Sequence, residues 1–381
     1  MVQREKRMDS PAQRVIIKLG TSTLTAGGVQ ISLPHLLELV KHIAALHKQG
    51  HAVLLISSGA IATGREVLKH PALEKHIPSK QMLAAVGQSR LMELYNQLFQ
   101  MYSITVGQVL LTRHDLLSRR RYLNARNTLE ALLAYRVIPI INENDTVATE
   151  EIRFGDNDNL SAQVASLVEA DLLVLMTDQD GLFTGDPRRD PNARMVSLVD
   201  APEIPAELWQ AAGGSQGALG TGGMETKLMA ADLARRAGVA VVITNGQRPQ
   251  DLPDVLAGAA VGTRFTPVIS KMESRKRYLL ANSGAAQNQV KVDAGAAVAI
   301  RKGGSLLPVG IRGCSGGFER GDVVQVVDPK GRPVAQGMVN YGVRELEKIA
   351  GHRSDQIEKR LGYTYGDEVI HHNNLLVVSH D

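Results

Sequence analysis

The sequence from residue 137 to residue 159 reads VIPIINENDTVATEEIRFGDNDN, and it decides the fold class. Its first five residues, Val137 to Ile141, form a short apolar run rich in β-branched side chains, which predicts a buried strand. Two clusters of carboxylate and amide side chains follow, at 142–145 and 156–159. Such clusters can bind one small polar ligand, although Asn and Asp also occur in ordinary turns and helix caps.

The same layout, a buried strand that ends in polar or glycine-rich residues, occurs at four other places. These strand ends read KLGTS from residue 18, ISSGA from 56, MTDQDG from 176 and ITNG from 243. Helical segments too long for hairpins separate the strands, which predicts an α/β fold with an open, mostly parallel sheet sandwiched by helices. Ligands bind at the carboxyl ends of the strands in such sheets, so we expect a binding site at this edge.

The periodicity of apolar residues predicts the individual elements and the domains. We expect strands at 14–18, 52–56, 104–111, 137–141, 171–176 and 239–243, and helices at 32–50, 81–102 and 160–169. We also expect one helix that begins near residue 115 and another that ends near residue 237. Short alternating strands broken by Gly, Asp and Pro predict a second, smaller, β-rich and barrel-like domain near the C-terminus. The expected division is a flexible tail at 1–13, a first domain at 14–270, a linker at 271–288 and a second domain with a tail at 289–381.

Composition limits the classes of function. A chain of 381 residues with 44% hydrophobic residues fits two globular domains. An aromatic content of 4% and a formal net charge of +4 argue against a dedicated nucleic-acid surface. Cys314 is the one cysteine, so no internal disulfide can form. The chain shows neither a signal-peptide pattern nor an apolar run of membrane-spanning length, and we expect a cytoplasmic protein without a membrane partner.

A glycine-rich stretch and two lysines suggest phosphate chemistry at the predicted sheet edge. The stretch from Gly213 to Lys227 reads GGSQGALGTGGMETK and leads into a helix. It lacks the P-loop pattern, and no dinucleotide fingerprint follows the first strand. Its backbone amides could still surround phosphates, with Lys227 and Lys18 as cations. A surface loop without a ligand and a solvated lysine remain alternatives.

The acceptor can be narrowed by what the sequence lacks. No candidate nucleophile or general base stands out, and the 11 histidines show no metal-ligand spacing. An alcohol acceptor needs a base, whereas a carboxylate with a pKa near 4 is already ionised at neutral pH. Two lysines, a glycine loop and Asp residues able to hold Mg²⁺ through water suit phosphoryl transfer. The residues therefore predict a kinase acting on a small anion, with a carboxylate favoured.

Eight motifs resemble the amino acid kinase family, in particular its glutamate-phosphorylating branch. In chain order they are VIIKLGTS, SSGAIATG, LAAVGQS, LNARNTL, INENDTVA, FGDNDNLSA, LMTDQDGLFTGDPR and GTGGMETK. The resemblance extends from Val15 over essentially the whole chain. It implies ATP- and Mg²⁺-dependent phosphorylation of the γ-carboxylate of L-glutamate, the first step of proline biosynthesis. It also implies inhibition by proline, a homo-oligomer, and hand-over of the labile product to a glutamyl-phosphate reductase.

Site residues carried over from this resemblance fall into three groups. Catalytic residues would be Lys18 and Lys227, which neutralise the phosphoryl charge, and Asp158, which orients both lysines. Glutamate would contact Ser58, Gly59, Ala60, Asn142, Asp145 and Asn157. ATP would contact Lys18, Thr177, Asp178, Thr221, Gly222, Gly223, Met224, Glu225, Thr226 and Lys227, and no direct protein ligand of the metal is expected. Glu225 stands where the family commonly has a small residue, so we expect its side chain to point away from ATP.

The segment from Gln289 to about Leu361 is similar to a PUA domain, a module known in RNA-modifying enzymes. Its basic residues are mixed with Asp and Glu, so a structural or regulatory role is favoured over RNA binding. Two alternatives for the whole chain stay open. One is another amino acid kinase that phosphorylates acetylglutamate, aspartate or a nucleoside monophosphate, and the other is an RNA-binding or regulatory protein built on a degenerate kinase fold.

Overall fold

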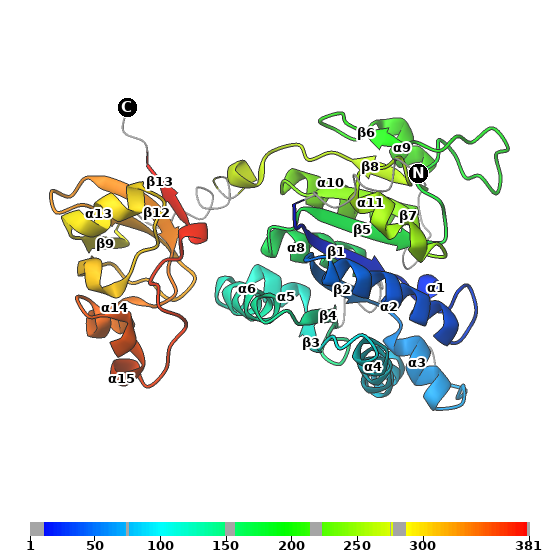
Figure 1. Ribbon diagram of the computed structural model, residues 1–381, viewed down its shortest axis with the longest axis horizontal. Helices are drawn as coiled ribbons and strands as arrows, with labels where there is room; N and C mark the ends of the chain where they lie inside the picture. The colour runs from blue at the N-terminus through cyan, green and yellow to red at the C-terminus, as the bar shows by residue number, and fades with distance from the viewer. Residues whose placement is uncertain are drawn as a thin grey trace. The chain divides into compact units, whose positions relative to one another are not determined.

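The computed structural model describes residues 11–73, 76–148, 157–213, 223–274, 276 and 287–378 (Figure 1). These residues form two units. The first comprises the described residues within 1–116 and 125–271, and the second those within 117–124 and 272–381. Each unit has its own sheet and its own hydrophobic core.

The elements between residues 14 and 265 are strands that are mostly separated by one or two helices. The strands are β1 (Arg14–Leu19), β2 (Ala52–Ser57), β3 (Val106–Leu111), β4 (Ile138–Glu143), β5 (Leu172–Thr177), β6 (Leu198–Val199), β7 (Ala240–Asn245) and β8 (Thr263–Phe265). The helices are α1 (Thr21–Leu24), α2 (Leu33–Lys48), α3 (Ala60–Val67), α4 (Ile77–Gln100), α5 (Arg113–Leu117), α6 (Arg119–Ala134), α8 (Asn157–Leu167), α9 (Ala206–Ala211), α10 (Met224–Arg236), α11 (Leu252–Leu256) and the 3-10 turn η2 (Pro249–Asp251).

The eight strands form one sheet in the order β3-β4-β2-β1-β5-β7-β8-β6. The five strands predicted to end in polar residues are consecutive in this order, and each pairs with its neighbour in parallel. Their carboxyl ends therefore lie along one edge, as the sequence predicts. Only β8 runs antiparallel to its neighbour β7, while it pairs in parallel with β6. The predicted α/β fold with a mostly parallel sheet is confirmed.

Both faces of this sheet are covered, which explains the continuous apolar runs of the strands. Val15 and Ile17 of β1 share one core with Leu36 of α2 and Leu91 of α4. Side chains at alternate positions point to the opposite face, where α8 contacts β1, β2 and β5, and α10 contacts β7. Ile16, on that second face, is fully buried as well. Figure 1 shows β1 between β2 and β5 in the middle of the layer.

Helix α8 begins three residues earlier than the sequence predicts. The expected start was residue 160, but the helix begins at Asn157, so Asn157 and Asp158 lie in its first turn. Their polar side chains made the segment resemble a loop. Both are buried, because strands and helices from elsewhere in the sequence contact them in the folded protein. The short elements β6, β8 and α9 were not predicted at all.

Two glycines allow helices α3 and α4 to cross at unusually short range. A Cβ atom at Gly64 would lie 1.8 Å from the carbonyl oxygen of Leu83, and one at Gly87 would lie 1.8 Å from that of Ala60. Any side chain at either position would force the helices apart. The crossing thus holds α4 against the start of α3, directly after the predicted ligand-binding residues Ser58 and Gly59.

The second unit contains a five-stranded sheet in the order β10-β9-β11-β12-β13. Its elements are β9 (Gln289–Val292), α13 (Ala294–Arg301), η3 (Pro308–Gly310), β10 (Ile311–Ser315), β11 (Val323–Val327), β12 (Pro333–Met338), α14 (Val343–Ile349), η4 (Ser354–Gln356), α15 (Ile357–Leu361), η5 (His372–Asn374) and β13 (Leu375–Val377). Strands β9 and β11 pair in parallel, and the other pairs are antiparallel. The predicted β-rich second domain is confirmed. Among the described residues, no helix is long and apolar enough to cross a membrane.

Candidate active site

A buried carboxylate lies between two buried ammonium groups at the edge of the large sheet. Lys18 near the end of β1 places Nζ 2.5 Å from Oδ1 of Asp158, and Lys227 in the first turns of α10 places Nζ 3.2 Å from Oδ2. Thr226 donates a hydrogen bond of 2.8 Å to the same Oδ2. The three charged residues are at most 5% exposed. The structure thus brings together the two lysines and the aspartate that the resemblance named.

The charges of this cluster stabilise each other. Burial by itself would raise the pKa of Asp158, but the ammonium groups of Lys18 and Lys227 and the hydrogen bonds of Lys18 and Thr226 outweigh it and lower that pKa to about 2. Burial lowers the pKa of Lys227, while Asp158 counteracts this change. Asp158 is therefore ionised at neutral pH and engaged by both ammonium groups.

A chain of hydrogen-bonded amides begins next to this cluster. Asn157 Nδ2 donates to Ser58 Oγ at 2.9 Å and to Asn142 Oδ1 at 2.8 Å. Asn142 Nδ2 in turn donates to Gln88 Oε1 at 2.8 Å. These hydrogen-bonded amides therefore connect the ends of β2 and β4, the start of α8 and the middle of α4. Three of the residues expected to bind glutamate belong to it.

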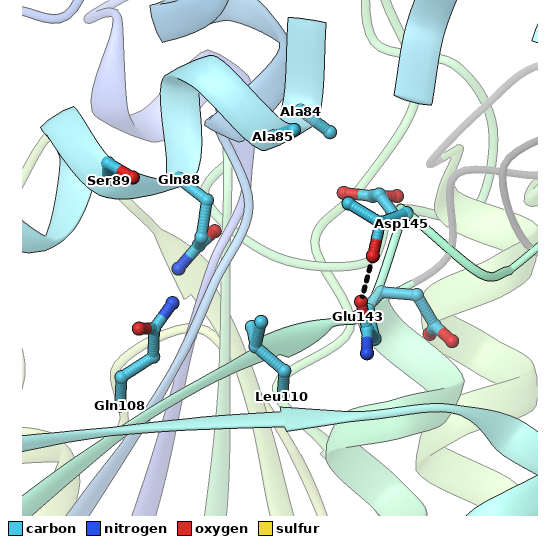
Figure 2. Close-up of a pocket in the computed structure, with 10 residues that line it drawn as sticks. Ala84, Ala85, Gln88, Ser89, Gln108, Leu110, Glu143 and Asp145 are labelled. Carbon is cyan, nitrogen blue, oxygen red and sulfur yellow. Dashed lines mark hydrogen bonds between the residues drawn. The ribbon is translucent and has the colours of Figure 1, made fainter. Parts of the chain in front are cut away.

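The remaining residues of the predicted acceptor site lie close by in the fold. Gly59 caps α3 with a φ of 101°, a left-handed conformation that favours glycine, and Ala60 is the first residue of α3. Asp145 lies just after β4 and lines a pocket of about 220 Å³ together with Gln88, Gln108, Glu143 and Asn144 (Figure 2). Burial raises the pKa of Asp145 to about 6. At neutral pH this pocket therefore contains a carboxylate that is ionised despite an unfavourable environment.

The residues expected to bind ATP are only partly described. Thr177 ends β5 and donates to the exposed Asp178 at 3.0 Å, and the charge of Asp178 acts on Lys227. Gly223 is the N-cap of α10, and Glu225 in its first turn is exposed. Thr221, Gly222 and the acidic residue Asp156 lie outside the described residues. The same is true of most of the glycine-rich loop.

A divalent metal would need several oxygen ligands. Within the described ranges, no group of three or more His, Cys, Asp or Glu side chains could hold a metal ion. Asp158 is engaged by two lysines, and the exposed Asp178 is a second carboxylate whose charge acts on Lys227.

Comparison with known proteins identifies the family. Residues 13–245 match the model of the amino acid kinase family, and residues 288–361 match that of the PUA domain. The chain belongs to the amino acid kinase family. This chain is 53% identical to a protein named glutamate 5-kinase from Shewanella oneidensis, over 96% of this chain and 98% of that protein. It is also 53% identical to the glutamate 5-kinase of Shewanella amazonensis, over 96% of each chain. The Photobacterium profundum glutamate 5-kinase is 50% identical over 98% of both chains.

These comparisons confirm the resemblance predicted from the eight motifs, and this amino acid kinase is accordingly an enzyme that uses ATP. One residue of the site was missed. Gln88 lies in the motif LAAVGQS, but a glutamine on a long helix gives no sign of where its side chain ends. Its position beside the predicted acceptor residues becomes visible only from the hydrogen bond with Asn142, which is 54 positions away in the sequence.

Proposed function

We propose that this amino acid kinase transfers the γ-phosphoryl group of ATP to the γ-carboxylate of L-glutamate and forms L-glutamyl 5-phosphate, the first step of proline biosynthesis. The observation that carries the proposal is the buried pair of lysines on Asp158, with the amide chain that starts at the adjacent Asn157. A charge-stabilising centre and an acceptor pocket are the two parts that phosphoryl transfer requires.

In the proposed mechanism, Lys18 and Lys227 neutralise the charge that develops on the transferring phosphoryl group. Asp158 keeps both ammonium groups aligned, so no reorganisation is needed during the reaction. The attacking oxygen belongs to an ionised carboxylate, and therefore no residue has to remove a proton. Mg²⁺ would enter with ATP and neutralise phosphate charge.

The acceptor would be held by residues of the amide chain and the pocket beside it. Asn157 directly precedes Asp158 in the sequence and donates to Ser58 Oγ, so both residues suit the reacting end of glutamate. Asp145 suits its α-ammonium group, because a buried carboxylate gains most from an adjacent cation. Gly59 permits the close turn at the start of α3.

We further propose the properties that the family resemblance implies. Proline would compete with glutamate in the same pocket, the enzyme would be a cytoplasmic homo-oligomer, and the acyl phosphate would pass to a reductase before it hydrolyses.

For the PUA-like domain we propose a structural or regulatory role. Three of its basic side chains are engaged locally: Arg312 with Asp293 at 2.7 Å, Arg332 with Asp328 at 2.7 Å, and the buried Arg320 over the ring of Tyr365. Such engagement leaves fewer cations for a phosphate backbone.

The proposal is tested by ADP release with purified enzyme, ATP and Mg²⁺. L-Glutamate should give the large signal, while acetylglutamate, aspartate and nucleoside monophosphates should give little. A larger signal with one of the other acceptors would reassign the substrate. Absence of activity with every acceptor, together with salt-dependent RNA binding, would favour the non-enzymatic alternative.

A further inference from the structure

The backbone of Glu143 determines which way every amide in the chain of hydrogen bonds points. Its N–H can only donate, and it donates to Asn142 Oδ1 at 2.9 Å. The opposite end of Asn142 is therefore the NH₂ group, which donates to Gln88. Gln88 must accept through Oε1, and its own NH₂ group is directed elsewhere.

This arrangement leaves one polar atom without a partner at each end of the chain. Among the described residues, neither Nε2 of Gln88 nor Oδ1 of Asn157 has a hydrogen-bond partner, although both atoms are buried. Gln88 is 9% exposed and Asn157 is 7% exposed. A buried donor without an acceptor costs free energy, so a ligand that accepts from Nε2 would recover it on binding.

The pocket beside Gln88 has donors on one side and a carboxylate on the other. Figure 2 shows the amide ends of Gln88 and Gln108 facing each other, with Asp145 on the opposite side of the pocket. The pocket volume of about 220 Å³ is far larger than a single water needs. An oxygen acceptor next to the amides and a cation next to Asp145 would match this distribution. An α-amino acid in its zwitterionic form carries both groups on one carbon atom.

We propose that Gln88 is a specificity-determining residue that donates through Nε2 to the α-carboxylate of the amino acid substrate. The inference rests on the proposed function, because it assumes that the reacting γ-carboxylate lies near Lys18 and Lys227. Gln88 is separated from that centre by Asn142 and Asn157, so it contacts the far end of the substrate. The hydrogen bonds among the amides hold Oε1 of Gln88 toward Asn142, so this oxygen cannot face the ligand. The site therefore favours a ligand with a hydrogen-bond acceptor next to Nε2 of Gln88.

The substitution Gln88→Glu tests this contact with little change in shape. The introduced carboxylate still accepts from Asn142, so the amide chain keeps its bonds, but the pocket loses a donor and gains a negative charge. A ligand with a neutral amide at the α-position can donate to that carboxylate, whereas the α-carboxylate of glutamate is repelled. The matched ligands are L-glutamate and L-isoglutamine, which differs from glutamate only in its α-carboxamide.

Dissociation constants of both ligands are measured by calorimetry without ATP, which makes the result independent of turnover. The wild type should bind glutamate more tightly than isoglutamine, and Gln88→Glu should change the ratio of the two constants at least tenfold toward isoglutamine. Gln97→Glu, the same change at an exposed position of α4, should leave the ratio within twofold.

If Gln88→Glu weakens the binding of both ligands equally, Gln88 is only structural and the inference is overturned. The same conclusion follows if the wild type binds no glutamate, whereas glutamate binding without ADP release would overturn the kinase proposal alone.

Discussion

Lys18 and Lys227 contact the two oxygens of one buried carboxylate, that of Asp158. One lysine comes from the first strand and the other from a helix near the end of the same unit, so only the folded chain brings them together. The charge of Lys18 acts unfavourably on Lys227, so the two ammonium groups would repel each other without the carboxylate that both contact. Asp158 therefore supports both the stability of the fold and the geometry of the site.

Replacement of this carboxylate should destabilise the protein strongly. Asp158→Asn keeps the shape but leaves two buried cations uncompensated, and the removal of one partner from a buried ion pair costs about 3–5 kcal/mol. Chemical denaturation at pH 7 should show a loss of this size, and activity should fall with it. Since the pKa of Asp158 is lowered to about 2, the wild-type contribution should persist above pH 4 and disappear only toward pH 2. An unchanged stability of Asp158→Asn would contradict this account.

Asp145 should show the opposite effect on stability. Burial raises its pKa to about 6 from the ordinary value of 3.8, so the folded protein is penalised when this group is ionised. Asp145→Asn should therefore stabilise the protein at pH 8 by up to about 3 kcal/mol, and most of this gain should be lost by pH 4 because the wild-type carboxyl is then neutral in the folded protein.

The same substitution should weaken glutamate binding, because it removes the charge opposite the α-ammonium group. For the wild type, KM for glutamate should rise as the pH falls below 6, while KM for ATP should change little. Thermal unfolding and initial rates across this pH range measure both effects. Stability that does not differ between the two proteins at pH 8 would show that Asp145 is not strained by burial.

The glycine crossing of α3 and α4 should be intolerant of a methyl group. Gly87→Ala would place a Cβ atom 1.8 Å from the carbonyl oxygen of Ala60, so α3 has to move away. We expect a loss of at least about 2 kcal/mol, despite the usual preference of helices for Ala over Gly. KM for glutamate should rise, since Ser58 and Gly59 precede α3. Gly295→Ala in α13 is the control, because its Cβ would meet no atom closer than 3.4 Å.

Much of this architecture could be predicted because it depends on local patterns. The strands of the sheet are apolar runs with polar exits, and parallel pairing alone places those exits at one edge. Lys18 and Asn142 were visible for this reason. Gln88 was not, because its side chain reaches the site only through the close crossing at Gly87, which no local pattern encodes. The early start of α8 was missed because Asn157 and Asp158 become favourable in a buried helix only once their partners from β1, β4 and α10 are present.

Both lysines should be required for catalysis and dispensable for the fold of the sheet. Lys18→Met and Lys227→Met each remove one cation from the transition state, and we expect turnover to fall at least a hundredfold, which corresponds to about 2.7 kcal/mol or more. Far-ultraviolet circular dichroism should remain like that of the wild type. Lys41→Met is the control. Lys41 is exposed on the surface of α2, and its one ion pair among the described residues is with Glu38, so this variant should show normal turnover.

The central claim is that a carboxylate receives the phosphoryl group between these two lysines. An acyl phosphate reacts with hydroxylamine to give a hydroxamate, whereas phosphate esters do not, so hydroxamate formation from L-glutamate, ATP and Mg²⁺ measures this step directly. We predict one hydroxamate for each ADP released by the wild type and almost none with Lys227→Met. ADP release without hydroxamate, or equal yields from both proteins, would contradict the account.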